Sequence, residues 1–199
     1  MKGRTAEDVV IQFEAGDVNW NDAEIEVLDG SFASLFASTG SNVLLRDTLG
    51  NDDVTLVKFA NLGGEVAVNV FDGTREIHVV DFDELSQHAV GQVNELVVRA
   101  FGNSFDTPEE LAAIGEAGSW GSFLELSSWT DVNPEDSSYS QSFDGLWWYD
   151  FLTEFVDYKS ETNPHEEFAG VFQVAVLDES VGHFARPKKD WMVALLGRL

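Results

Sequence analysis

Acidic residues outnumber basic ones over most of the second half of this chain. Residues 100–185 carry 17 Asp and Glu side chains and a single base, Lys159, whereas residues 1–99 carry 18 acids and six bases. The formal net charge of the 199 residues is −25. A segment with this imbalance cannot neutralise itself, so it folds only if its apolar residues form a core that outweighs the repulsion.

The apolar content is high enough for such a core. Hydrophobic residues make up 44% of the chain and include 15 Phe and 6 Trp, a composition that excludes a disordered acidic tail. A chain of this length buries about 70% of its unfolded surface when it folds as one body. We therefore expect a single domain over residues 1–185, followed by a distinct terminal element at residues 186–199.

Several classes of site and location are disfavoured by what the sequence lacks. The chain has no cysteine, which excludes disulfides, thiol catalysis and cysteine-ligated metals. Its first residues include acids before a short apolar run, and no stretch of about 18 uncharged apolar residues occurs. We expect a protein of the cytoplasm or of a virion that is not secreted through a signal peptide and does not bind membranes.

Residues 8–80 show the two-residue periodicity of β-strands. Apolar and polar residues alternate at 9–14, 24–27, 54–59, 65–71 and 76–80. Turn residues separate these segments, at Asp29-Gly30, Gly50-Asn51-Asp52, Gly63-Gly64 and Asp72-Gly73. The pattern predicts an antiparallel sheet of four to six strands.

Residues 82–160 are predicted to be rich in helix. Apolar spacing favours a helix over 83–101 that Gly102 stops, and Thr107-Pro108 is typical of the start of a second helix. Residues 130–143 predict a surface loop, 144–159 an aromatic helix and 168–177 a late strand. Strands followed by helices predict an α+β fold, in which an antiparallel sheet from the N-terminal half packs against helices mostly from the C-terminal half.

The sequence contains none of the common nucleotide-binding or hydrolase motifs. Its four histidines, at positions 78, 88, 165 and 183, have carboxylate neighbours by chance in so acidic a chain. We predict no catalytic residue and no cofactor. The enzyme class that remains is an acidic carboxylate-dependent hydrolase, in which Glu125, Asp144 and Asp150 would lie near the tryptophans at 120, 129, 147 and 148.

Two segments resemble the opening of a calcium-binding loop, Asp17-x-Asn19-x-Asn21 and Asp131-x-Asn133-x-Glu135. Both lack the Gly at position six and the Glu at position twelve that the helix-loop-helix site requires. Turns whose side chains bond their own backbone are the simpler interpretation. A looser oxygen-ligand site for a divalent cation stays open.

The last fourteen residues differ in charge from the rest. Arg186, Lys188, Lys189 and Arg198 face a single acid, Asp190, and apolar residues recur there at helical spacing. This predicts a basic amphipathic helix over 186–199 with Pro187 in its first turn. Such a helix docks either on its own chain or on a neighbouring subunit.

The basic tail and the aromatic, acidic body together favour assembly as the function. We predict a non-enzymatic structural protein, a homo-oligomeric subunit of a symmetric complex such as a viral particle, that binds itself or other subunits and does not bind nucleic acid directly. The predicted interface residues are Trp147, Trp148, Tyr149, Phe151, Tyr158, Arg186, Lys188, Lys189, Trp191, Leu195 and Leu196.

Two other interpretations explain the acidity differently. Carboxylates on a rigid surface can mimic phosphates, which would make the protein an inhibitor of a DNA- or RNA-binding enzyme. A halophilic environment would explain the charge without any partner, because the Debye length falls to about 3 Å at 1 M salt. The second interpretation is compatible with assembly.

Overall fold

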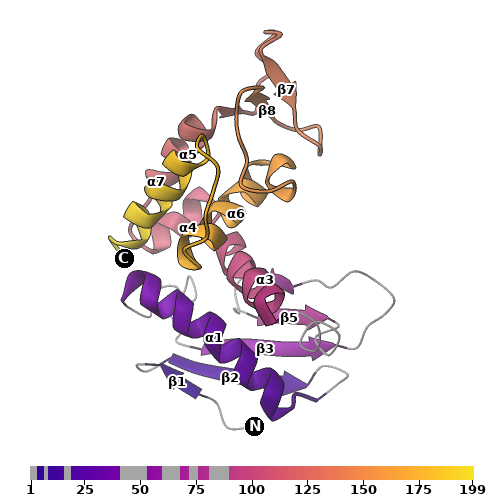
Figure 1. Cartoon of the computed structure of the whole chain (residues 1–199), viewed down its shortest axis with the longest axis vertical. Coiled ribbons are helices and arrows are strands. Elements are labelled where there is room, and N and C mark those ends of the chain that lie inside the picture. The colour runs from indigo at the N-terminus through magenta and orange to yellow at the C-terminus, as the bar shows by residue number, and fades with distance from the viewer. Residues whose placement is uncertain are drawn as a thin grey trace. The chain divides into compact units, whose positions relative to one another are not determined.

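The computed structural model describes residues 4–6, 9–15, 19–40, 53–59, 68–71, 76–80 and 90–199 (Figure 1). The chain groups into two compact units, residues 1–104 and residues 105–198, which we call unit 1 and unit 2. The predicted α+β class is confirmed. The single domain expected over residues 1–185 stays a prediction.

Unit 1 contains a five-stranded sheet with the strand order β1-β2-β3-β5-β4. Its strands are β1 (Arg4–Ala6), β2 (Val9–Ala15), β3 (Asp53–Phe59), β4 (Val68–Phe71) and β5 (Glu76–Val80). The strands predicted at 9–14, 54–59 and 76–80 are confirmed, and that at 65–71 is confirmed over 68–71. The wholly antiparallel pairing is wrong, because β3 runs parallel to both β2 and β5. A helical crossover joins β2 to β3 and allows their parallel pairing.

The crossover helix α1 (Asp22–Thr39) replaces the strand predicted at 24–27 and the turn predicted at Asp29-Gly30. The side chain of Asn21 accepts a hydrogen bond from the Glu24 N–H, and the Glu24 carboxylate accepts one from the Asn21 N–H. This capping box starts the helix within a segment whose alternation is too short to specify a strand. Gly40, at φ 67°, ends it.

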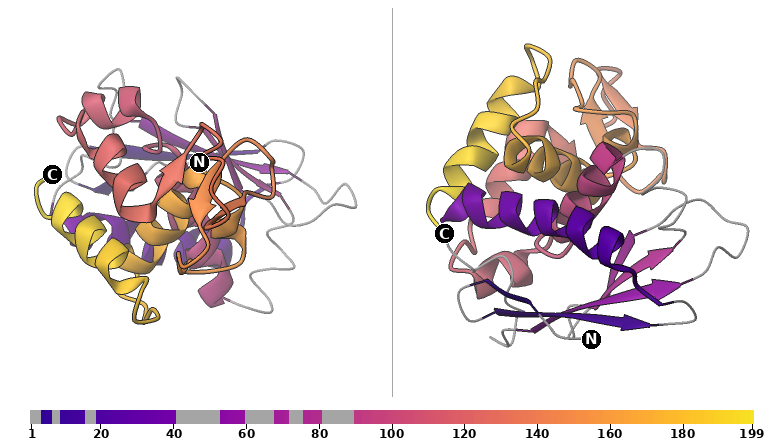
Figure 2. Two further views of the ribbon diagram at one scale, coloured as in Figure 1. Left: turned by 90° about the horizontal axis from the view of Figure 1, so that it is seen from above. Right: turned by 60° about the horizontal axis from the view of Figure 1, so that its bottom comes forward.

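Helices α1 and α3 (Val90–Asn103) pack together in unit 1, and Figure 2 shows α1 lying along one face of the sheet. The rings of Phe32 and Phe101 meet edge to face at 5.9 Å, and Ser31 Oγ donates to Asn94 Oδ1 at 2.6 Å. The helix predicted over 83–101 is confirmed from Val90 onward, but the predicted stop at Gly102 is wrong because the helix continues to Asn103. Residues 81–89 and the predicted turns at 50–52, 63–64 and 72–73 lie outside the described residues.

A buried ion pair joins α1 to β3. Lys58 Nζ lies 2.7 Å from Glu24 Oε1 and 3.3 Å from the carbonyl oxygen of Asn19, and it approaches the ring of Trp20 to 5.9 Å. Both charged side chains are almost completely buried. Such groups are tolerated inside a protein because each satisfies the other.

Unit 2 is mostly helical, with a small antiparallel sheet of order β6-β8-β7. Its helices are α4 (Pro108–Ala113), α5 (Ser119–Ser127), α6 (Pro164–Val176), α7 (Arg186–Leu196) and the short 3₁₀ helix η2 (Lys159–Glu161). Its strands are β6 (Trp129–Thr130), β7 (Tyr139–Gln141) and β8 (Trp148–Asp150). The helix start predicted at Thr107-Pro108 is confirmed, because the Thr107 hydroxyl accepts a hydrogen bond from the Glu110 N–H.

Three predicted elements of unit 2 need correction. Residues 168–177 do not form a strand but belong mainly to α6, which is buried continuously from Phe168 to Ala175 and therefore lacks the usual amphipathic period. The helix predicted over 144–159 is wrong, because Trp148 and Tyr149 belong to strand β8, where Tyr149 pairs with Trp129. The surface loop predicted over 130–143 includes strand β7.

Helix α7 confirms the predicted basic helix over residues 186–196 and completes the core of unit 2. Met192, Leu195 and Leu196 are buried, and the ring of Trp191 lies 5.4 Å from that of Phe123. The helix packs against α5 and α6. In the part of the chain that the structure describes, the helices are too short or too polar to cross a lipid bilayer.

Candidate functional site

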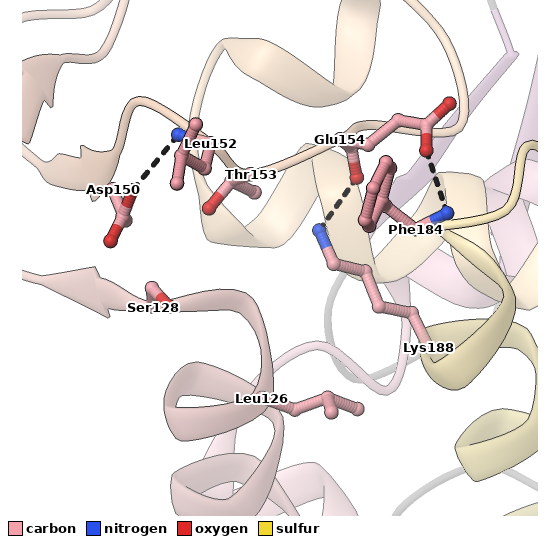
Figure 3. Close-up of a pocket in the computed structure, with 8 residues that line it drawn as sticks. All are labelled: Leu126, Ser128, Asp150, Leu152, Thr153, Glu154, Phe184 and Lys188. Atoms are coloured by element: carbon pink, nitrogen blue, oxygen red, sulfur yellow. Dashed lines mark hydrogen bonds between the residues drawn. The ribbon is translucent and has the colours of Figure 1, made fainter.

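An open pocket of about 220 Å³ lies in unit 2 where the end of α5, the segment after β8 and the start of α7 come together (Figure 3). Its wall combines apolar and charged side chains. The lining residues are Leu126, Ser128, Asp150, Leu152, Thr153, Glu154, Phe184 and Lys188.

The segment after β8 is held by two local interactions. Asp150 Oδ1 accepts a hydrogen bond from the Leu152 N–H at 2.9 Å, and the Asp150 carbonyl accepts one from the Thr153 N–H at 2.8 Å. This tight turn places Leu152 and Thr153 at the pocket wall. Leu152 remains 73% exposed, so its apolar side chain is available at the pocket mouth.

Glu154 connects this segment to the loop before α7. Its Oε2 accepts a hydrogen bond from the Phe184 N–H at 2.8 Å, and its carbonyl oxygen accepts one from Lys188 Nζ at 2.9 Å. A Cβ atom at Gly182 would lie 2.0 Å from Glu154 Oε1, so the carboxylate occupies the space that a larger residue at position 182 would need. Glu154 therefore holds the loop before α7 against the segment after β8.

Lys188, which lines the pocket, belongs to a buried ion pair. The ammonium of Lys188 donates to Glu167 Oε1, while Trp129 Nε1 donates to Glu167 Oε2 at 2.6 Å. Phe155 presents its ring 5.0 Å from Lys188 Nζ. Burial raises the pKa of Glu167, although Lys188 and Trp129 act to lower it. Because neither charged side chain is accessible, this pair stabilises the fold and positions the pocket.

Most cations of unit 2 are bound by its own carboxylates. Residues 105–198 carry 18 acids and 5 bases. Besides the buried Lys188, three bases form ion pairs: Lys159 with Glu166 at 3.3 Å, Lys189 with Asp178 at 2.8 Å and Arg198 with Glu116 at 2.7 Å. Within the described residues Arg186 has no ion pair, and it is exposed at the start of α7. The remaining carboxylates leave the unit strongly anionic.

Large exposed apolar side chains gather in two places in unit 2. The first group, which we call the pocket rim, consists of Leu126, Leu152 and Phe184, which line the pocket. Phe143 and Leu146, from the β7–β8 turn, and Tyr158, which precedes η2, are also exposed. Exposed apolar residues that cluster on a soluble domain are typical of interaction sites.

The predicted interface residues differ in accessibility. Phe151, Tyr158 and Arg186 are exposed, and Trp147, Trp148, Lys189 and Trp191 are half-buried. The others are buried inside unit 2: Tyr149, Lys188, Leu195 and Leu196. The hydroxyl of Tyr149 donates to Glu161 Oε1 at 2.5 Å, and burial together with this carboxylate raises its pKa to about 12. Sequence reasoning missed Leu152, Glu154 and Phe184, because no local signal marks an exposed apolar residue in a loop.

His165 has the best-defined environment of the histidines in the described residues. Its Nδ1 lies 2.9 Å from the Asp106 carbonyl oxygen and 3.6 Å from Asp106 Oδ2. A carbonyl only accepts, so Nδ1 carries the hydrogen and Nε2 is the basic nitrogen of the neutral ring. The ring stacks on Trp120 at 4.9 Å and meets Trp147 edge-on at 6.3 Å. Among the described residues, no hydroxyl is hydrogen-bonded to this ring.

We expect His165 to titrate above the ordinary value of 6.5. The hydrogen bond with the Asp106 side chain raises its pKa more than burial lowers it. The stability gained is therefore fully present below about pH 6.5 and is lost as pH rises through the folded-state pKa. Proton NMR of the ring should show a lower midpoint for Asp106→Asn, while Asp178→Asn should leave it unchanged. Equal midpoints in wild type and Asp106→Asn would contradict the assignment.

The residues considered for metal binding are engaged in local turns. Asn133 Oδ1 accepts from the Glu135 N–H and Asp136 Oδ1 from the Ser138 N–H, both at 2.9 Å. Asp17 lies outside the described residues, and within them no three acidic or histidine side chains come together as a metal site would require. Of the carboxylates considered for a hydrolase, Asp150 lines the pocket, whereas Asp144 accepts from Asn163 Nδ2.

Comparison with known proteins places no further constraint on this pocket. No protein-family model, no curated protein and no solved structure matches the chain.

Proposed function

We propose that this protein is a non-enzymatic assembly subunit that associates with copies of itself through the pocket rim. The observation that carries the proposal is the exposed apolar group Leu126, Leu152 and Phe184 around the pocket. The chain has a net charge of −25, so an accessible cluster of apolar side chains on it is unusual. A contact between subunits would explain why these side chains are exposed on the isolated chain.

Charges of both signs lie beside the pocket rim, which suits a two-fold contact between identical copies. Arg186 is exposed two residues after Phe184, and the carboxylates of Asp150 and Glu154 line the pocket. In an isologous contact each copy supplies the same patch, so Arg186 of one copy can meet a carboxylate of the other. This gives the basic tail a role in registering subunits, with Arg186 as its available charge.

Burial of the pocket rim would supply most of the affinity. Each large apolar side chain that becomes buried contributes roughly 1.5–3 kcal/mol, and association must first overcome several kcal/mol of lost freedom. Repulsion between anionic copies opposes contact at low salt and is screened within about 3 Å at 1 M salt. We therefore propose a closed symmetric complex, such as a viral particle or a cytoplasmic assembly, that is strengthened by salt.

We expect the native mass of the full chain, measured by light scattering, to rise with salt concentration. Leu152→Ser and Phe184→Ser should each shift the equilibrium towards the monomer by about tenfold or more, because each removes an anchor from the contact. Leu146→Ser is the matched control, since Leu146 is 67% exposed and Leu152 73%. A monomeric mass at every salt concentration, or equal effects of Leu152→Ser and Leu146→Ser, would refute the proposal.

A further inference from the structure

We propose that Phe143 and Tyr158 form a docking site for a cationic segment of another protein, whose Lys or Arg side chains stack on the two rings. We call these two residues the aromatic pair. The site is separate from the pocket rim and recognises a different chemistry. Three features support the docking site: the geometry of the two rings, the hydrogen bonds that hold the segments carrying them, and the negative charge around them.

The aromatic pair is a contact between two side chains that nevertheless face solvent. The ring centroids lie 5.1 Å apart with the planes inclined at 44°. Phe143 is 56% exposed and Tyr158 is 77% exposed. Two large rings from segments fifteen residues apart therefore leave π-faces accessible, which is the arrangement that cation recognition uses.

The turn that carries Phe143 is ordered by hydrogen bonds. Asp144 Oδ1 accepts from Ser142 Oγ at 2.6 Å and from the Leu146 N–H at 3.0 Å, and Asp144 Oδ2 accepts from Asn163 Nδ2 at 3.1 Å. On the other segment, Asp157 Oδ1 accepts from the Ser160 N–H at 2.7 Å. A site whose segments are already fixed loses little conformational freedom when a partner binds.

Each ring of the aromatic pair is next to a carboxylate in the chain. Asp144 follows Phe143, and Asp157 precedes Tyr158; both acids are exposed. Partial burial opposes ionisation of Asp144, but hydrogen bonds from Ser142, Leu146 and Asn163 outweigh it and lower the pKa of this group. The neighbouring cation, Lys159, forms an ion pair with Glu166. Ring faces beside ionised carboxylates favour a positively charged ligand.

The net negative charge of unit 2 also favours a cationic partner. With 18 acids and 5 bases, the unit attracts cationic segments over long range and repels nucleic acids. Apolar residues between the cations of the partner would add contact with Leu146, which is exposed in the same turn. We therefore assign the site to a basic, partly apolar protein segment.

The test uses the full chain and a labelled peptide of about twelve residues that alternates Arg with Leu, with a Glu–Leu peptide of the same length for comparison. Fluorescence anisotropy should detect binding of the Arg peptide alone, and the affinity should fall as salt is raised from ~20 to ~200 mM. Phe143→Ser and Tyr158→Ser should each weaken binding by about fivefold or more, whereas Tyr158→Phe should bind like wild type because it keeps the ring.

The matched control is Phe184→Ser, because Phe184 is 72% exposed and lies in the pocket rim. Its affinity for the Arg peptide should equal that of wild type, although its self-association should weaken. Circular dichroism of each variant separates lost binding from lost folding. The proposal is overturned if the Arg peptide does not bind, if the Glu peptide binds equally well, or if folded Phe143→Ser and Tyr158→Ser bind like wild type.

Discussion

Methionine in place of Lys188 should lower the free energy of unfolding of unit 2 by about 3–5 kcal/mol, the usual cost of breaking a buried ion pair. The substitution leaves the Glu167 carboxylate completely buried, with Trp129 Nε1 as its remaining donor among the hydrogen bonds described above. It also removes the donor that binds the Glu154 carbonyl at the pocket. Urea unfolding followed by tryptophan fluorescence measures the loss.

Two further variants decide whether charge burial is the cause. The double change Lys188→Met with Glu167→Gln removes both charges and keeps an oxygen acceptor for Trp129, so it should recover at least half of the lost stability. Lys189→Met breaks an ion pair whose partner, Asp178, is fully exposed, and it should change stability little. If Lys188→Met were as stable as Lys189→Met, the pair would not support unit 2.

A chain that ends at Ala185 should lose the cooperative unfolding of unit 2. The truncation removes Met192, Leu195 and Leu196, all buried, and takes Lys188 away from Glu167. Each buried apolar side chain contributes about 2–5 kcal/mol, and a whole domain is stable by only about 5–15 kcal/mol. Circular dichroism of the truncated chain during thermal unfolding should show that what remains of unit 2 loses its helix in a broad, non-cooperative transition.

A chain that ends at Gly197 is the control for this truncation. It loses Leu199 and Arg198, whose ion pair with Glu116 is partly exposed, and should unfold cooperatively like the full chain. Cooperative unfolding of the shorter chain would mean that α7 is a detachable tail, as required if it docked on a neighbouring subunit. Loss of cooperative unfolding, which we expect, would show that α7 is an integral part of unit 2.

The elements that could be predicted from sequence are those with a strong local signal. Strand β2 alternates polar and apolar residues from Ile11 to Glu14, β3 and β5 are rich in β-branched residues, and α4 begins with an N-cap and a proline. Helix α6 was not predicted, because it is buried continuously from Phe168 to Ala175 and has no polar face in that stretch. The aromatic residues of 147–149 suggested a helix, although such residues suit strands equally well and tertiary packing decides between the two.

The candidate sites depend on contacts between distant residues, which a single sequence does not reveal. Lys188 attracted attention as a tail cation, but its partner Glu167 lies in another helix. The exposure of Leu152 and Phe184 results from the way their loops cross the unit. Likewise, Phe143 and Tyr158 become a pair only through the turn that follows β7.

The buried pair between Glu24 and Lys58 has a consequence for how unit 1 selects its strand alignment. β3 carries apolar residues at both sets of alternating positions, Val54 and Leu56 in one and Val57 and Phe59 in the other, so hydrophobicity alone discriminates poorly against a slip of one residue. Such a slip would turn Lys58 to the opposite face and take its ammonium away from the buried Glu24 carboxylate. The buried Glu24–Lys58 pair thus favours the native register of β3 over one shifted by a single residue.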